Sequence, residues 1–223
     1  MRLFLIALFL LLTTATSFAK WVDGYITLTD GTNVNGRINV PYVNMESRAI
    51  LLLGTDLSHF YYSVRFANKE LGKKCYYPGD IKGFGFTIKA ADFHFVSLDV
   101  QYRSIVKNER EREQFLHVLY SNEVVLMTRL VPFYYEIPGM EGWGGVNHVN
   151  SYDYYLYNSE MGLTRLQVNK EFKSLKNILQ LYGVSEVFLE QLPENIKRFD
   201  VYNILLEYDM WKTSRGQSTI LNT

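Results

Sequence analysis

The feature that most constrains this chain is a series of short alternating segments, rich in aromatic and β-branched residues, which turn signals separate at even intervals. Alternation of apolar and polar residues is typical of strands that bury one face. Even spacing with a turn between neighbours predicts an antiparallel meander. The expected strands are residues 21–28, 34–40, 49–53, 59–66, 81–88, 93–102, 123–131, 133–137, 152–157 and 163–168.

A short helix is expected between the two groups of strands, over residues 108–122. Phe115, Leu116 and Leu119 are spaced by three and four, which places them on one helical face. Asn108 can cap the start of this helix, and the acidic residues that follow it suit a first turn.

From residue 169 the apolar period is helical to the end of the chain. One stripe closes at Gly183, a second helix opens at Ser185 and stops before Pro193, and Asp200 is expected to cap a third. The stripes consist of Phe172, Leu175, Ile178, Leu179 and Tyr182, and of Val201, Ile204, Leu205 and Tyr208.

Strands followed by helices predict an α+β fold: an antiparallel β meander, as a sheet or partly open barrel, with C-terminal helices packed on it. We expect a single domain over residues 20–212, β-rich in 20–168 and helical in 169–212. Residues 213–223 are expected to form a flexible polar tail.

The N-terminus has the features of a secretory signal peptide. Arg2 precedes an apolar run over residues 3–12, and Ser17-Phe18-Ala19 fits a signal-peptidase site. The run is shorter than the about 20 residues that span a bilayer. We therefore predict that residues 1–19 are removed, that the mature chain begins at Lys20 without a transmembrane anchor, and that it is periplasmic or extracellular.

The charge balance argues against nucleic acid as a partner. The chain has 23 Lys and Arg against 23 Asp and Glu, so no basic field is available for a phosphate backbone. Cys75, the one cysteine, cannot form an intramolecular disulfide. Although neighbouring lysines could activate it as a thiolate, the interpretation as a half-buried strand residue is favoured.

Several short motifs resemble those of uncharacterised exported proteins of the Bacteroidetes type. They are Gly24-Tyr25-Ile26, Asp30-Gly31-Thr32, Gly36-Arg37-Ile38, the stretch from Tyr77-Pro78-Gly79-Asp80 to Phe84, and residues 115–119 with 124–126. The resemblance implies the Gram-negative envelope and carries no known chemistry. The same glycines also have a structural interpretation, as tight turns or close approaches between strands.

The segment most typical of a binding site is residues 138–148, where four glycines surround one tryptophan. Loops of this kind often bind ligands, and a tryptophan is a frequent anchor at interfaces. We predict a binding site of Tyr135, Glu141, Trp143 and His148 for a protein or glycan partner. A mobile connection between strands is the simpler interpretation and the favoured one; if any segment carries an interaction surface, we expect it to be this one.

No cofactor and no metal site are expected, because the four histidines have no metal-ligand spacing. The favoured function is an envelope-associated binding or structural role without catalysis. The alternative is a small hydrolase that draws acid-base residues from Asp92, His94, Glu141 and His148. Asp92 and His94 fall on the same side of one expected strand, and we favour a surface pair for them.

Overall fold

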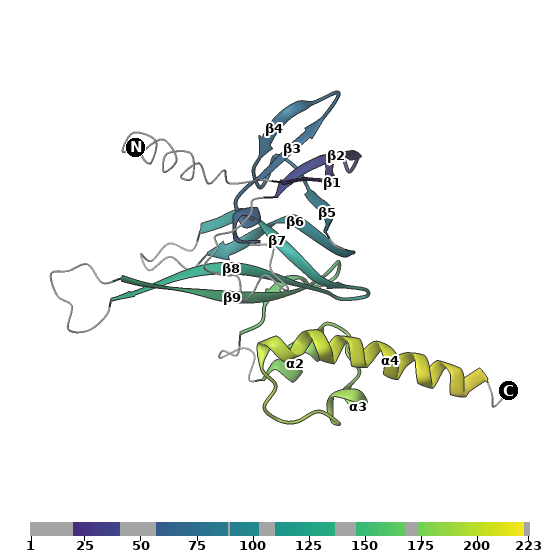
Figure 1. The fold of residues 1–223 in the computed structure, drawn as a ribbon. Coiled ribbons are helices and arrows are strands. Elements are labelled where there is room, and N and C mark those ends of the chain that lie inside the picture. Colours follow the sequence, from purple (N-terminus) through teal and green to yellow (C-terminus); the bar gives the residue numbers. More distant parts are fainter. Residues whose placement is uncertain are drawn as a thin grey trace, which may run out of the picture. The chain divides into compact units, whose positions relative to one another are not determined.

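The computed structural model describes residues 20–40, 57–88, 90–102, 110–136, 146–167 and 174–220. Ten described strands form an open antiparallel sheet in the order β10-β9-β8-β7-β6-β5-β1-β2-β3-β4, and helices follow the last strand (Figure 1). The predicted α+β meander with C-terminal helices is confirmed. By its internal contacts the chain divides into two compact units, Met1–Asp92 and Phe93–Thr223, which are described in turn. The expectation of a single domain stays a prediction.

The first unit opens with the predicted hairpin. The Asp30 carboxylate accepts a 2.7 Å hydrogen bond from the Thr32 N–H, and Gly31 adopts φ +94° at the turn. The strands of this unit are β1 (Lys20–Thr27), β2 (Asn33–Val40), β3 (Val64–Asn68), β4 (Gly72–Tyr76) and β5 (Gly83–Ile88).

One strand expected in this unit is partly wrong. Ser58–Tyr61 forms the 3-10 helix η2, and β3 begins only at Val64. Phe60 and Tyr61 are consecutive and both buried, which a strand with one buried face does not allow. The Phe60 ring lies 4.9 Å from that of Phe86. The expected strand 49–53 lies outside the described residues.

Strand β4 was not expected, because its sequence is polar and begins at a glycine that reads as a turn. Gly72 does adopt φ +68°, and the chain turns there into a strand paired with β3. Cys75 lies half-buried on β4, so its interpretation as a half-buried strand residue is confirmed.

Two glycines permit close contact between strands, as one of the two interpretations had it. A Cβ atom on Gly24 would lie 2.5 Å from the carbonyl oxygen of Gly85. One on Gly36 would lie 2.6 Å from the carbonyl oxygen of Ala67 and would overlap the Phe66 ring.

The second unit holds the longer strands and the described helices other than η2. The strands are β6 (Ala91–Tyr102), β7 (Arg110–Ser121), β8 (Val125–Glu136), β9 (Val146–Asn158) and β10 (Gly162–Arg165). Residues 158–162 form the predicted turn between β9 and β10, whose first pair is Gly162 with Asn158.

The helix expected over residues 108–122 is wrong, because Arg110–Ser121 is strand β7, paired with both β6 and β8. Phe115 and Leu116 are both fully buried, which shows that this strand is covered on its two faces. Contiguous apolar residues in such a strand imitate one face of a helix. A β-bulge between Val118 and Tyr120 disturbs the alternation further.

The predicted helical region forms α2 (Leu175–Leu181), α3 (Glu186–Leu189), the 3-10 helix η3 (Arg198–Asp200) and α4 (Val201–Ile220). Gly183 follows the end of α2, as predicted. The Asp200 carboxylate accepts a 3.0 Å hydrogen bond from the Lys197 N–H, so it stabilises the turn of η3. Helix α4 continues past Thr213, where the polar tail begins in the sequence.

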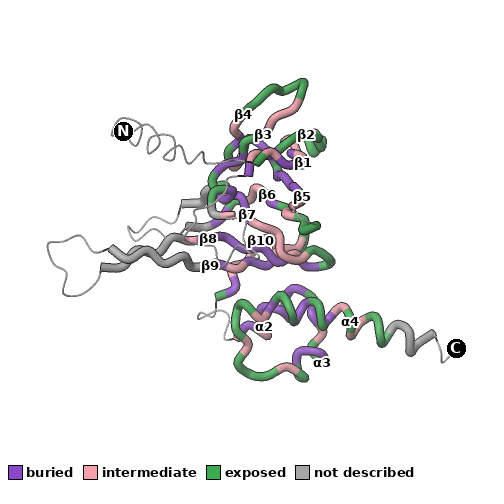
Figure 2. Tube along the Cα trace, viewed as in Figure 1, coloured by how far each residue is buried: buried purple, intermediate pink, exposed green. Residues whose placement is uncertain are grey.

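The helices pack on strand residues of the same unit and complete one core, as predicted. Figure 2 shows buried segments on the helices and on the strands of this unit. This core includes Leu126 and Leu156 on the strands, and Val124 and Leu166 next to β8 and β10. Its helix residues include Ile178, Leu179, Phe188, Val201 and Leu205.

Candidate functional site

The predicted binding residues belong to one hairpin, formed by β8 and β9. Tyr135 lies on β8, where it pairs with Asn147, and His148 lies on β9, where it pairs with Tyr134. The structure therefore brings Tyr135 and His148 to neighbouring pairs of one ladder. Glu141 and Trp143 lie outside the described residues, in the connection between the two strands.

The hairpin extends well beyond its neighbours in the sheet. In the described part of the chain, β7 pairs with β8 only from His117 to Ser121, and β10 pairs with β9 only from Gly162 to Arg165. Eight further pairs join β8 to β9 alone, from Arg129 with Asp153 to Glu136 with Val146. We call these eight pairs the β8–β9 ribbon. Figure 1 shows both strands running side by side toward their connection.

Pro132 identifies this part of β8 as a sheet edge. A proline has no N–H group to donate, so within sheets it is confined to edges, strand starts and bulges. The two strands expected over 123–131 and 133–137 are in fact one, and Pro132 pairs with Asn150 in its middle. The sequence predicts that the strand breaks at Pro132. The strand continues because, at a sheet edge, only the N–H groups that face β9 are needed for pairing.

At the base of the ribbon, a charged cluster lies buried. Asp153 accepts from Arg165 at 2.6 Å and lies 3.4 Å from Nη2 of Arg129, whose other amino group donates to Gln114 at 2.6 Å. The side chains of Arg129 and Asp153 are almost fully buried, whereas that of Arg165 is 37% exposed. Burial raises the pKa of the neighbouring Tyr155 to about 12, so its phenol stays protonated. This cluster holds β8, β9 and β10 together by charge and does not display a reactive group.

The residues of the alternative hydrolase are not brought together in the described structure. Asp92 is exposed and accepts a 2.6 Å hydrogen bond from the Thr87 hydroxyl. His94 is exposed on β6, Glu141 lies outside the described residues, and His148 is described by its backbone alone. Of the four residues, only the side chains of Asp92 and His94 are described, and both are exposed on β6.

His117 lies in an aromatic environment that sequence reasoning missed. Its ring stacks with those of Phe95 and Phe93, at centroid distances of 4.9 and 5.9 Å. Burial, with a smaller contribution from His94, lowers the pKa of His117 to about 4. The ring is therefore neutral at physiological pH.

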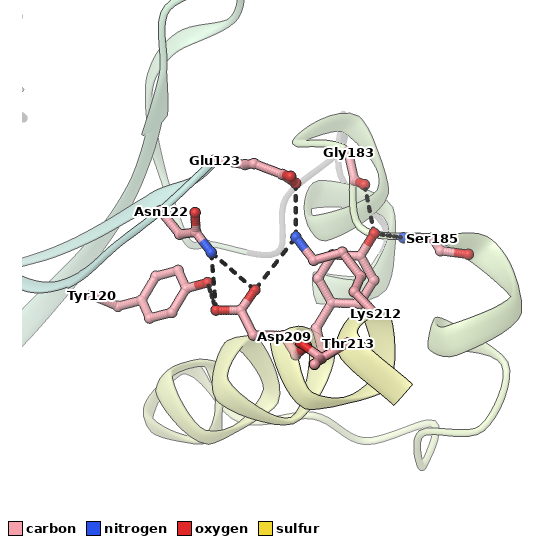
Figure 3. A network of polar contacts seen from close by, with 9 residues as sticks. Tyr120, Asn122, Glu123, Gly183, Ser185, Asp209, Lys212 and Thr213 are labelled. Atoms are coloured by element: carbon pink, nitrogen blue, oxygen red, sulfur yellow. Dashed lines mark hydrogen bonds and ion pairs between the residues drawn. The ribbon is translucent and has the colours of Figure 1, made fainter. Parts of the chain in front are cut away.

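A polar network joins the turn between β7 and β8 to helix α4 (Figure 3). The Asp209 carboxylate accepts from the Tyr120 hydroxyl at 2.5 Å and from the Asn122 amide at 3.2 Å. Lys212 bridges Asp209 at 3.4 Å and Glu123 at 2.9 Å. Burial and the bond to Asp209 raise the pKa of Tyr120 to about 12. The network fixes α4 on the strands.

Several exposed apolar side chains lie on η3 and α4, and sequence reasoning also missed them. Phe199, Tyr202, Leu206 and Met210 are 62%, 40%, 39% and 65% exposed. The available signal was the spacing of four between Tyr202, Leu206 and Met210, which places these three on one side of α4, whereas Phe199 precedes them in η3. The same segment has a more apolar stripe, which drew attention away from this spacing: Val201, Ile204, Leu205 and Tyr208.

Comparison with known proteins identifies no relative: no family model, no curated protein and no solved structure matches the chain. Within the described helices, none is long and apolar enough to cross a membrane. Among the described side chains, no group of three His, Cys, Asp or Glu residues could hold a metal ion.

Proposed function

We propose that this chain is an exported, envelope-associated binding protein without catalytic activity, and that it holds a protein or glycan partner at the far end of the β8–β9 ribbon. The observation that carries the proposal is the ribbon itself, whose eight pairs join β8 to β9 with no other strand paired to them among the described residues. In the described part of the chain the ribbon ends at Glu136, which pairs with Val146.

Two physical arguments support a binding role for this ribbon. A two-stranded hairpin is marginally stable in water, so the ribbon gains from a partner that covers it. The strand edges of the ribbon that pair with no described strand can also offer backbone groups to an added strand, a common mode of peptide recognition. Pro132 leaves a gap in the donors of one edge, which limits uncontrolled pairing with other chains.

The residue composition near the connection suits recognition. Tyr134 and Tyr135 stand two and one positions before the end of β8, and Trp143 follows in the sequence. Tyrosine and tryptophan supply large rigid contact areas with a polar tip, for protein surfaces as for sugar rings. Trp143 is the anchor in this proposal.

Site-specific photo-crosslinking in the producing cells tests the proposal. A photoreactive residue at Tyr135 is expected to form one discrete adduct, and the same residue at Gln180, exposed on α2, is expected to form none. Protease or glycosidase treatment of the adduct then distinguishes a protein from a glycan. Trp143→Ala should weaken the interaction by roughly 2 kcal/mol, or about 30-fold, with an unchanged melting temperature. Equal adducts at both positions, or a full adduct in the Trp143→Ala chain, would place the binding site elsewhere.

A further inference from the structure

One face of the sheet in the first unit gathers three cations. In β2 and β3 the core side chains are even-numbered, so the odd-numbered residues lie on the opposite face. This outer face carries Arg37 on β2, Arg65 on β3 and Lys73 on β4, and all three side chains are exposed. Ala67 pairs with both Arg37 and Lys73, so the side chain between these two in the ladder is a methyl group. We call Arg37, Arg65 and Lys73 the cationic triad.

Trp21 on β1 holds two members of the triad in place. Its backbone carbonyl oxygen accepts a 3.3 Å hydrogen bond from Nη2 of Arg37, and the centroid of its ring lies 5.7 Å from Nζ of Lys73. A carbonyl group and an aromatic ring attract a cation without neutralising it, since neither has a net charge. Like charges that are held on one surface in this way favour a bound anion, which lowers their mutual repulsion.

The outer face does not cancel the charge of the triad. Asp23 is the only acidic residue at the odd-numbered positions of β1 to β4, and it lies opposite Arg37 in the ladder of β1 with β2. Within the described residues, neither Asp23 nor any other carboxylate forms an ion pair with the triad. Three positive charges and one negative charge leave +2 on this face, in a chain whose formal net charge is zero.

We propose that the cationic triad binds an acidic glycan, whose carboxylate or sulfate groups contact its three side chains. Arginine donates in a planar fork that matches a pair of anionic oxygens, and lysine adds a mobile point charge. Asn35 and Asn39 stand on either side of Arg37 on the same face of β2. Their amides both donate and accept hydrogen bonds, as the hydroxyl groups of a sugar ring require. The site lies in the first unit, so the inference does not depend on the ribbon.

The composition of this face suits a glycan better than a protein or a nucleic acid. The core of a protein interface is apolar. In the described part of the first unit, the large apolar side chains with the highest exposure are Tyr62, Leu71 and Tyr77, and all three lie outside β1 to β5. Nucleic acid requires a more extended basic surface than three cations, and the charge balance of the chain provides none.

Calorimetric titration of the mature chain with a heparin octasaccharide, which carries sulfate and carboxylate groups, tests the proposal. The wild type should bind it at low salt and lose affinity as salt screens the exposed charges. Lys73→Gln should weaken binding about tenfold, because a hydrogen bond between charged groups is lost. Lys74→Gln is the matched control. It removes the same charge at the next position of β4, where the side chain lies on the other face with Nζ 4.7 Å from the centroid of the Tyr76 ring.

Arg65→Gln is a second variant of the triad and should weaken binding about as much as Lys73→Gln. Circular dichroism and melting temperature establish that the three variants are folded. A neutral maltooligosaccharide of the same length should not bind. The proposal is overturned by a wild type that does not bind the heparin octasaccharide, or by Lys73→Gln and Lys74→Gln chains that bind it alike. Equal affinity for a single-stranded oligothymidylate of the same charge would identify a general polyanion surface and would also overturn it.

Discussion

The hydroxyl of Tyr120, at the end of β7, donates a 2.5 Å hydrogen bond to the carboxylate of Asp209 in the middle of α4. The two residues are 89 positions apart, and the bond joins the strands to the last helix of the chain. Burial alone would raise the pKa of Asp209, but hydrogen bonds from Tyr120, Asn122 and Lys212 outweigh it and hold the pKa below its usual value. The carboxylate is therefore charged in the folded state.

We predict that Tyr120→Phe lowers the free energy of unfolding by about 1–2 kcal/mol at pH 7, because a hydrogen bond to a charged group is lost. The folded pKa of Asp209 is depressed, so its contribution is present above its unfolded pKa near 4 and is lost as pH falls through the folded pKa. The effect of Tyr120→Phe should therefore shrink at pH 2.5. Urea unfolding at the two pH values measures it, with Glu194→Gln, an exposed carboxylate, as control.

The stacked His117 predicts a second dependence on acid. Its folded pKa of about 4 lies below that of an unfolded histidine, so the unfolded chain binds the proton first as pH falls. Stability from this group is complete above pH 6.5, declines between 6.5 and 4, and is lost below, by at most about 3 kcal/mol. In His117→Phe the decline over this interval should be shallower than in wild type, whereas His59→Gln, at an exposed histidine, should follow wild type. Parallel curves for His117→Phe and wild type would contradict the assignment.

Much of the fold could be predicted because its information is local. Turn signals such as Asp30-Gly31-Thr32 stop strands whatever surrounds them, and the stripe of Val201, Ile204, Leu205 and Tyr208 buries one helix face. Strand β7 could not be predicted in this way. Its contiguous apolar residues result from cover on both faces, which only the tertiary structure reveals.

The candidate site could likewise be predicted only in part. The alternating residues of β8 and β9 predicted strands, so Tyr135 and His148 could be placed near one connection. The length of the ribbon could not be predicted from the sequence. A proline in the middle of a strand indicates a break, and Pro132 is compatible with a continuous strand only if that strand lies at a sheet edge. Contacts such as Tyr120 with Asp209 leave no periodic signal, since neither residue constrains the other in sequence.

The close approach of β2 and β3 predicts a strong effect at Gly36. In Gly36→Ala the new methyl group meets the Ala67 carbonyl oxygen and the Phe66 ring, so we expect a loss of about 2 kcal/mol or more from overpacking. Gly72→Asn is the control, because that position has open space and a positive φ that asparagine tolerates. Thermal unfolding measures the melting temperatures of both variants, and that of Gly36→Ala should be clearly the lower. Similar melting temperatures for the two variants would show that β2 and β3 can move apart at little cost in free energy.

The N-terminal residues predict processing during export. When the full chain is expressed with its own leader in a Gram-negative host, we expect mature protein that starts at Lys20 in the periplasm or the medium. Intact-mass spectrometry of the fractionated cells measures this. Ala19→Arg should block cleavage and retain the leader, because the site needs a small residue there. Cytoplasmic protein that retains Met1 in the unmodified chain would refute the export assignment.

The cluster around Asp153 predicts the largest single effect on stability in the second unit. Asp153→Asn keeps the shape of the side chain but leaves two guanidinium groups without the carboxylate between them, one of them almost fully buried. Removing one partner from a buried charge cluster typically costs about 3–5 kcal/mol. Arg165→Gln should cost about 1 kcal/mol or less, because that side chain is partly exposed and water can replace the contact. Chemical denaturation at pH 7 measures the free energy of unfolding of both variants. If Asp153→Asn unfolds within about 1 kcal/mol of wild type, the cluster is solvated and does not hold β8, β9 and β10 together.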